Sequence, residues 1–117
     1  MNILESEKEN WEKFVQNNQD PYGSACVNVS KRVMELLDEH EGELEEGYYP
    51  NLNTPHGLIC KADDDIKAGG ITGYMAGVVA SAVSNFHPRG EEFRKIWNSK
   101  HNHEGEGVVN PAILNID

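Results

Sequence analysis

The sequence predicts an all-α fold of about four helices packed round a central helix rich in Gly and Ala, and three observations support it. Apolar residues recur at the i, i+3, i+4 spacing of a buried helical stripe, as at Trp11, Phe14 and Val15. One long stretch is apolar on nearly every side, as in a buried central helix. The chain of 117 residues is the usual size of one domain, so residues 1–117 are predicted to form a single helical domain.

The first two helices are predicted from apolar stripes. Residues 6–16 form the first helix, on the stripe that contains Trp11. Residues 22–39 form the second. Asp20-Pro21 interrupts the helical conformation between the two, because the residue before a proline is extended. One face of this second helix is apolar and the other charged, which indicates packing on the core by one side. That apolar face consists of Cys26, Val29, Val33, Leu36 and Leu37.

A long irregular connection and the central helix are predicted next. Residues 47–62 contain many turn formers, and a loop of this length in a small domain is uncommon unless it is functional or mobile. Residues 64–86 are predicted to form the central helix, with Asp63–Asp65 at its start, where carboxylates suit the helix dipole. Its Gly and Ala residues would let neighbouring helices approach closely.

The last helix is predicted at residues 91–99, where Phe93, Ile96 and Trp97 repeat the buried spacing. Residues 101–117 form a polar, Gly-containing tail with an apolar end. A terminal apolar segment of this kind docks either on its own core or on a second copy, so a homodimer stays open.

The net charge of −10, from 20 acids against 10 bases, disfavours nucleic acids and anionic membranes as direct partners. Seven acids fall between residues 35 and 46, next to two tyrosines that offer ring faces and hydroxyls to a partner. We therefore expect the partner-binding residues to be Glu35, Asp38, Glu39, Glu41, Glu43, Glu45, Glu46, Tyr48 and Tyr49. The alternative is that the acids are a solvated face and the tyrosines cover the core.

The sequence carries no sign of a metal, a cofactor or export. The five histidines and two cysteines lack the spacing of a zinc site. A Cys60–His56 nucleophilic pair depends on proximity in space, which the sequence alone does not give. The first residues lack the basic and apolar regions of a signal peptide, and no apolar run is long enough to span a bilayer. We expect a cytoplasmic protein without a cofactor.

Several fragments occur together in one order along the chain: Trp11-x-x-Phe14, Asp20-Pro21-Tyr22-Gly23, Gly70-Ile71-Thr72-Gly73-Tyr74-Met75, Glu91-Glu92-Phe93-Arg94 with Trp97-Asn98, and Asn110-Pro111-Ala112-Ile113-Leu114-Asn115. In this combination the chain resembles a family of small uncharacterised proteins encoded by bacteriophages and prophages. The resemblance implies a phage accessory protein, a class that often binds a host protein or a host signal molecule. It implies no activity and no site residues. Pro88 and the acidic run after Leu37 depart from the family's pattern.

The leading hypothesis is a non-enzymatic inhibitor whose acidic face binds a basic, nucleic-acid-binding surface of a host protein, as an anti-CRISPR protein would. A second hypothesis is a binder of a nucleotide signal, using Tyr48, Tyr49, Arg89 and Arg94. A third is a magnesium-dependent nucleotide hydrolase, with Glu35, Asp38 and Glu39 facing Asp63, Asp64 and Asp65. The glycines of residues 69–73 do not meet a phosphate-binding fingerprint, since no strand precedes them and no lysine follows.

Overall fold

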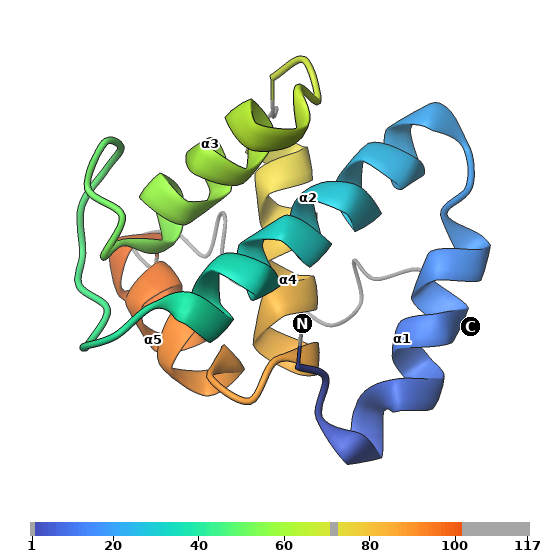
Figure 1. Cartoon of the computed structure of the whole chain (residues 1–117), viewed down its shortest axis with the longest axis horizontal. Helices are drawn as coiled ribbons and strands as arrows, with labels where there is room; N and C mark the ends of the chain where they lie inside the picture. Colours follow the sequence, from blue (N-terminus) through green and yellow to red (C-terminus); the bar gives the residue numbers. More distant parts are fainter. Residues whose placement is uncertain (1, 71–72, 102–117) are drawn as a thin grey trace.

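The computed structural model describes residues 2–70 and 73–101 (Figure 1). Within these residues the chain forms helices, turns and connections without a strand, so the predicted all-α class is confirmed. The described residues contain five α-helices instead of the four expected, preceded by one short 3-10 helix. In chain order the elements are η1 (Glu5–Glu7), α1 (Lys8–Asn17), α2 (Pro21–Glu39), α3 (Pro55–Ile66), α4 (Gly73–Phe86) and α5 (Gly90–His101).

The centre of the fold is the crossing of α2 over α4 (Figure 1). α2 packs against α3 and α4, and α4 packs in addition against α5 and α3. Val29 and Val33 from α2 are completely buried, as are Val79 and Val83 from α4. Burying such side chains contributes roughly 1.5–3 kcal/mol each. Three small residues of α4, Ala80, Ser81 and Ala82, are completely buried as well, which permits the close approach of neighbouring helices.

An aromatic cluster attaches α1 to this centre. The Trp11 and Phe86 rings meet edge-on at 5.4 Å between centroids, and Phe14 lies 5.9 Å from Phe86. The backbone N–H of Leu4 donates to the carbonyl of Phe86 over 2.7 Å, which fastens the start of the chain to the end of α4. Trp11 and Phe14, which the sequence pattern assigned to a buried stripe, therefore do pack on the core.

α2 begins where the sequence changes from polar to amphipathic. Asp20 is its N-cap, and its carboxylate accepts from the N–H of Gly23 over 3.3 Å. Pro21 takes the first helical position, where a missing N–H costs nothing. The helix spans residues 21–39, so the prediction of 22–39 is confirmed to within one residue.

The predicted irregular connection at 47–62 is wrong in its second half, because α3 begins at Pro55. Thr54 is the N-cap of α3, and its hydroxyl accepts from the N–H of Gly57 over 2.9 Å. Pro55 and Gly57 look like turn formers in sequence, yet here they begin a helix. A Cβ at position 57 would lie 1.9 Å from the carbonyl oxygen of Asn51, so the close approach of that loop requires glycine.

The predicted helix over 64–86 is also wrong, because two helices share that stretch. Lys67 ends α3 in the left-handed conformation, with φ 55° and ψ 49°. Gly69 and Gly70 follow with φ of 93° and 103°, values that glycine adopts freely. Asp63–Asp65 thus lie at the C-terminal end of α3, and their predicted role as an N-cap is wrong.

The predicted tail falls largely outside the described residues, so its apolar end and the homodimer stay predictions. None of the helices in the described part is long and apolar enough to cross a membrane. The predicted helix at 91–99 corresponds to α5, which starts one residue earlier at Gly90.

A buried histidine ties the end of α2 to the start of α5. His87 is 3% exposed, and its Nε2 lies 2.8 Å from Oδ1 of Asp38. The backbone N–H of Arg89 donates to its Nδ1 over 3.0 Å. Because Nδ1 accepts from Arg89, Nε2 carries the ring proton that is donated to the Asp38 carboxylate. Burial acts to raise the pKa of Asp38, but the contacts from His87 and from the backbone of Asn2 outweigh it and lower that pKa.

This lowered pKa predicts a loss of stability in acid. A carboxyl whose folded pKa is depressed stabilises the fold above its unfolded pKa, and this contribution disappears as the pH falls through the folded value. We expect the melting temperature to decline between about pH 5 and pH 2. An Asp38→Asn variant should melt lower than wild type at pH 7 and decline less steeply in acid. Equal slopes for the two proteins would contradict this role of Asp38.

Candidate functional site

The connection between α2 and α3 carries most of the predicted site residues. We call residues 40–53 the acidic tyrosine loop. It contains Glu41, Glu43, Glu45 and Glu46, followed by two tyrosines, and no Lys or Arg occurs anywhere between Arg32 and Lys61. In Figure 1 it is the extended green segment at the edge of the molecule, away from α1.

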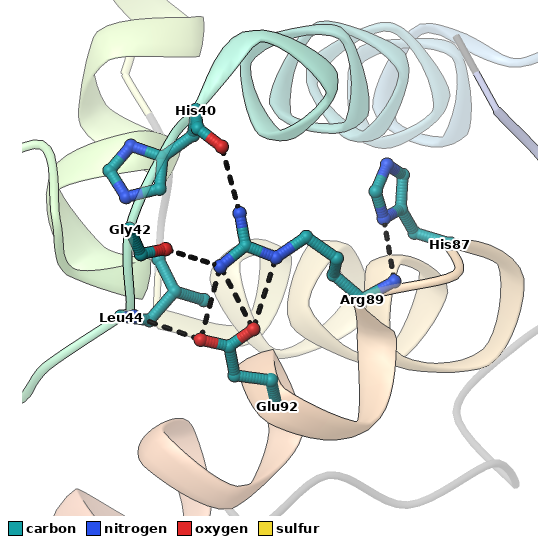
Figure 2. A network of polar contacts seen from close by, with 6 residues as sticks. All are labelled: His40, Gly42, Leu44, His87, Arg89 and Glu92. Carbon is teal, nitrogen blue, oxygen red and sulfur yellow. Dashed lines mark hydrogen bonds and ion pairs between the residues drawn. The ribbon is translucent and has the colours of Figure 1, made fainter.

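Arg89, just before α5, fixes the first part of this loop from outside it. Figure 2 shows its guanidinium between the loop backbone and a carboxylate. It donates to the carbonyls of His40 over 3.0 Å and Gly42 over 2.7 Å. It also forms a forked ion pair with Glu92, with the closest nitrogen 2.9 Å from Oε1. Such charge-assisted, two-pronged contacts are among the stronger hydrogen bonds in proteins.

Glu92 completes the attachment. Its Oε2 accepts from the backbone N–H of Leu44 over 2.9 Å (Figure 2). Partial burial acts to raise the pKa of Glu92, but the Leu44 N–H and the Arg89 guanidinium more than compensate and lower it. The carboxylate therefore stays charged at neutral pH. The side chain of Leu44 is buried in the core, so this part of the loop is held by apolar packing as well.

The second part of the loop is closed by its own hydrogen bonds. The N–H of Glu45 donates to the carbonyl of Asn53 over 2.7 Å, and the N–H of Asn51 donates to the carbonyl of Tyr48 over 3.0 Å. The Thr54 hydroxyl donates to the carbonyl of Asn51 over 2.7 Å, which joins the turn to the start of α3. The loop is irregular in secondary structure but anchored along its length.

Two tyrosines project from this anchored loop. Tyr48 is 66% exposed and Tyr49 is 48% exposed, and Leu52 is exposed beside them. The Tyr48 ring lies 5.4 Å from the His56 ring, which stacks on Trp97 at 4.5 Å. Trp97 belongs to the buried core. An exposed aromatic side chain is thus supported from beneath by a rigid stack.

The structure separates the predicted site residues into two sets. Glu41, Glu43, Glu45 and Glu46 lie exposed on the same loop as Tyr48 and Tyr49, and Glu39 is exposed at the end of α2. Glu45 and Glu46 also accept hydrogen bonds, from the side chains of Asn53 and Ser99. Two further acids bind an arginine or a histidine of the chain itself. Glu35 pairs with Arg32 over 3.2 Å, and Asp38 binds His87. The exposed residues can meet a partner, whereas Glu35 and Asp38 organise the fold.

The sequence reasoning missed the residues that hold the loop. Arg89 was expected among the ligand-binding residues of a nucleotide site, but its guanidinium is already occupied by the loop and Glu92. The i, i+3 spacing of Arg89 and Glu92 could have indicated their ion pair. Nothing in sequence indicated the contacts to His40 and Gly42, more than forty residues away.

Acids of α2 and α3 do face each other, as the hydrolase hypothesis requires, but a cation lies between them. Arg32 donates from Nε to Asp65 over 2.9 Å and from Nη1 to Glu35 over 3.2 Å. Lys61 also contacts Asp65, over 2.6 Å. Hydrogen bonds from Lys61 and Arg32 lower the pKa of Asp65. Among the described residues no group of three His, Cys, Asp or Glu could hold a metal ion.

Comparison with known proteins gives one informative result. Searches of curated proteins and of solved structures produced no match. A protein-family model described as type I Thoeris inhibitor Tad4 matches residues 1–117, the full length of the chain. This agrees with the phage setting that the resemblance implied, and it establishes an anti-defence inhibitor. The chain therefore belongs to the Tad4 family of type I Thoeris inhibitors.

Proposed function

We propose that this protein inhibits type I Thoeris defence without catalysis, by docking the acidic tyrosine loop on a basic surface of a host defence protein in the cytoplasm. The observation that carries the proposal is the pairing of exposure with anchoring in that loop. Tyr48 and Tyr49 are exposed, while Arg89 and Glu92 hold the first part of the loop and backbone hydrogen bonds close the turn that carries the tyrosines.

Anchoring favours tight binding because the free protein has already lost the conformational entropy that a mobile loop would lose on association. Tyrosine is enriched among the residues that dominate binding energy, since its ring buries a large area and its hydroxyl can still bond. The tilted contact of Tyr48 with His56, which itself stacks on Trp97, limits the orientations of the Tyr48 ring. The loop has the properties of a preformed interaction surface.

The negative charge of the loop favours a partner with a basic surface. Four exposed glutamates without a Lys or Arg nearby in sequence create a negative local potential. A basic surface on the partner would be attracted over roughly one Debye length, about 8 Å at physiological salt. Such steering raises the association rate more than it raises the affinity, and it weakens as salt increases.

The two other hypotheses are less well supported by the same residues. The nucleotide site built on Arg89 lacks a free guanidinium, because the loop and Glu92 occupy it. In the hydrolase site, Arg32 already binds Glu35 and Asp65, and His87 binds Asp38. The contacts of Arg89 and Arg32 are both compatible with the inhibitor proposal.

The experiment is a binding measurement against each purified protein component of a type I Thoeris system. A Tyr48→Ser/Tyr49→Ser variant should bind its target at least tenfold more weakly than wild type, about 1.4 kcal/mol. Tyr22 and Tyr74 provide a matched control, because they are 44% and 62% exposed and touch each other on another part of the surface. The Tyr22→Ser/Tyr74→Ser variant should keep wild-type affinity and inhibition.

Charge is tested separately with Glu41→Gln, Glu43→Gln, Glu45→Gln and Glu46→Gln combined. This variant should associate more slowly than wild type at low salt and at a similar rate at high salt. Equal binding by the loop variants and the control variant would overturn the proposal. So would a rate that salt does not change.

A further inference from the structure

A basic groove lies at the other end of the α2–α3 pair. The acidic tyrosine loop joins the C-terminal end of α2 to the start of α3, whereas this groove lies between residues 21–35 of α2 and residues 66–68 at the end of α3. Its volume is about 500 Å³, within the usual range of small-molecule sites. In Figure 1 the yellow-green turn after α3 and the blue start of α2 lie at the same end of the α2–α3 pair.

Three of the chain's 10 basic side chains line this groove: Lys31, Arg32 and Lys67. Arg32 is bound to Glu35 and Asp65, and Lys61 also binds Asp65, so two cations balance these two acids. Lys31 and Lys67 are exposed, and within the described residues neither ammonium group has an ion-pair partner. The groove lining therefore has three cations against one carboxylate, Glu35, which is a local excess of positive charge in a chain of net charge −10.

The rest of the groove is suited to an uncharged, partly apolar body. Ser24 and Asn28 lie one helical turn apart on α2 and line the groove, and their side chains have no hydrogen-bond partner within the described residues. Ile66 supplies an exposed apolar surface opposite them. A hydroxyl and an amide beside an apolar surface can orient a ring that carries both donors and acceptors.

We propose that this groove binds a small phosphate-bearing ligand of nucleotide size. Lys31 and Lys67 hold the phosphate as point charges, and Asn28 and Ser24 bond the base or sugar over Ile66. A nucleic-acid polymer is disfavoured, because its further phosphates would meet the negative charge of the rest of the chain. The site is separate from the acidic tyrosine loop, so it adds a second binding activity to the proposed inhibitor.

The test is a titration of the full chain, labelled with nitrogen-15, with 5′-AMP, adenosine and inorganic phosphate in parallel. AMP should shift the backbone amides of Ser24, Asn28, Lys31 and Lys67, and it should bind more tightly than adenosine or phosphate alone. A Lys31→Gln/Lys67→Gln variant should bind AMP about tenfold more weakly, since two charge-assisted contacts are lost.

Lys8 and Lys13 on α1 serve as controls, since they are exposed and away from the groove, and a Lys8→Gln/Lys13→Gln variant should bind AMP like wild type. No shift at millimolar AMP, shifts confined to other residues, or equal binding by the groove variant would overturn the proposal. If phosphate alone binds as tightly as AMP, the inference that the groove recognises a ligand of nucleotide size is wrong. The tyrosine-loop variant should keep AMP binding, so failure here is distinguishable from failure of the inhibitor proposal.

Discussion

Replacing Arg89 with alanine should lower the free energy of unfolding by about 3 kcal/mol, because hydrogen bonds to charged groups contribute about 1.5–3 kcal/mol and partners left unpaired cost more. The change removes the donors to the His40 and Gly42 carbonyls and leaves Glu92 without its cation. It should also weaken inhibition, since the acidic tyrosine loop would lose the contacts that hold its first part. Urea unfolding and target binding of the same variant measure the two effects.

Hydrogen exchange gives a more local measurement of the Arg89→Ala change. The N–H of Leu44 and the N–H of Glu45 are hydrogen-bonded in the loop and should exchange faster in the variant. Amides at the centre of α2 and α4 should show the smaller change expected from the loss of global stability alone. Exchange that accelerates equally everywhere would contradict a specific role of Arg89 in the loop.

Arg94 is the control for Arg89. It lies within α5, five residues after Arg89, and makes one long ion pair with Glu91, at 3.9 Å. Exposed pairs of this kind contribute about 0–1 kcal/mol, so Arg94→Ala should leave stability and binding almost unchanged. Similar losses for the two arginine variants would indicate that the total charge matters and that the contacts of Arg89 do not.

The sequence predicted the elements that depend on local pattern. α2 has an apolar stripe and an unambiguous start at Asp20-Pro21, and its limits were accurate to one residue. α3 was missed because Thr54, Pro55 and Gly57 belong equally to loops and to helix starts. The hydrogen bond from the N–H of Gly57 to the Thr54 hydroxyl identifies this segment as a helix start, and the sequence does not show that bond.

The candidate site divides in the same way. Acids and tyrosines concentrated in one segment were evident from sequence, and the exposed ones do lie together in the structure. The contacts that anchor this segment join α2 and its following loop to the start of α5, far apart along the chain. The basic groove is equally non-local, since Lys31 belongs to α2 and Lys67 ends α3, and both line one groove only because α2 packs on α3.

Gly57→Ala should be strongly destabilising, by about 3 kcal/mol, although alanine is normally the better helix former by about 1 kcal/mol. The new Cβ would lie 1.9 Å from the carbonyl oxygen of Asn51, a backbone atom that cannot rotate away. Relief requires moving the loop or the start of α3, and either movement breaks the contact between the Thr54 hydroxyl and Asn51. Urea unfolding followed by circular dichroism measures the loss.

Cys60→Ala provides the comparison on the same helix, because Cys60 is exposed. This substitution should change the free energy of unfolding by less than about 0.5 kcal/mol. The Gly57 variant should also bind its target more weakly than its stability loss alone explains, because the displaced segment carries Tyr48 and Tyr49. A Gly57→Ala protein as stable as wild type would mean that the loop does not approach α3 this closely. The inhibitor proposal depends on a preformed loop surface, and this result would remove the evidence that the loop is preformed.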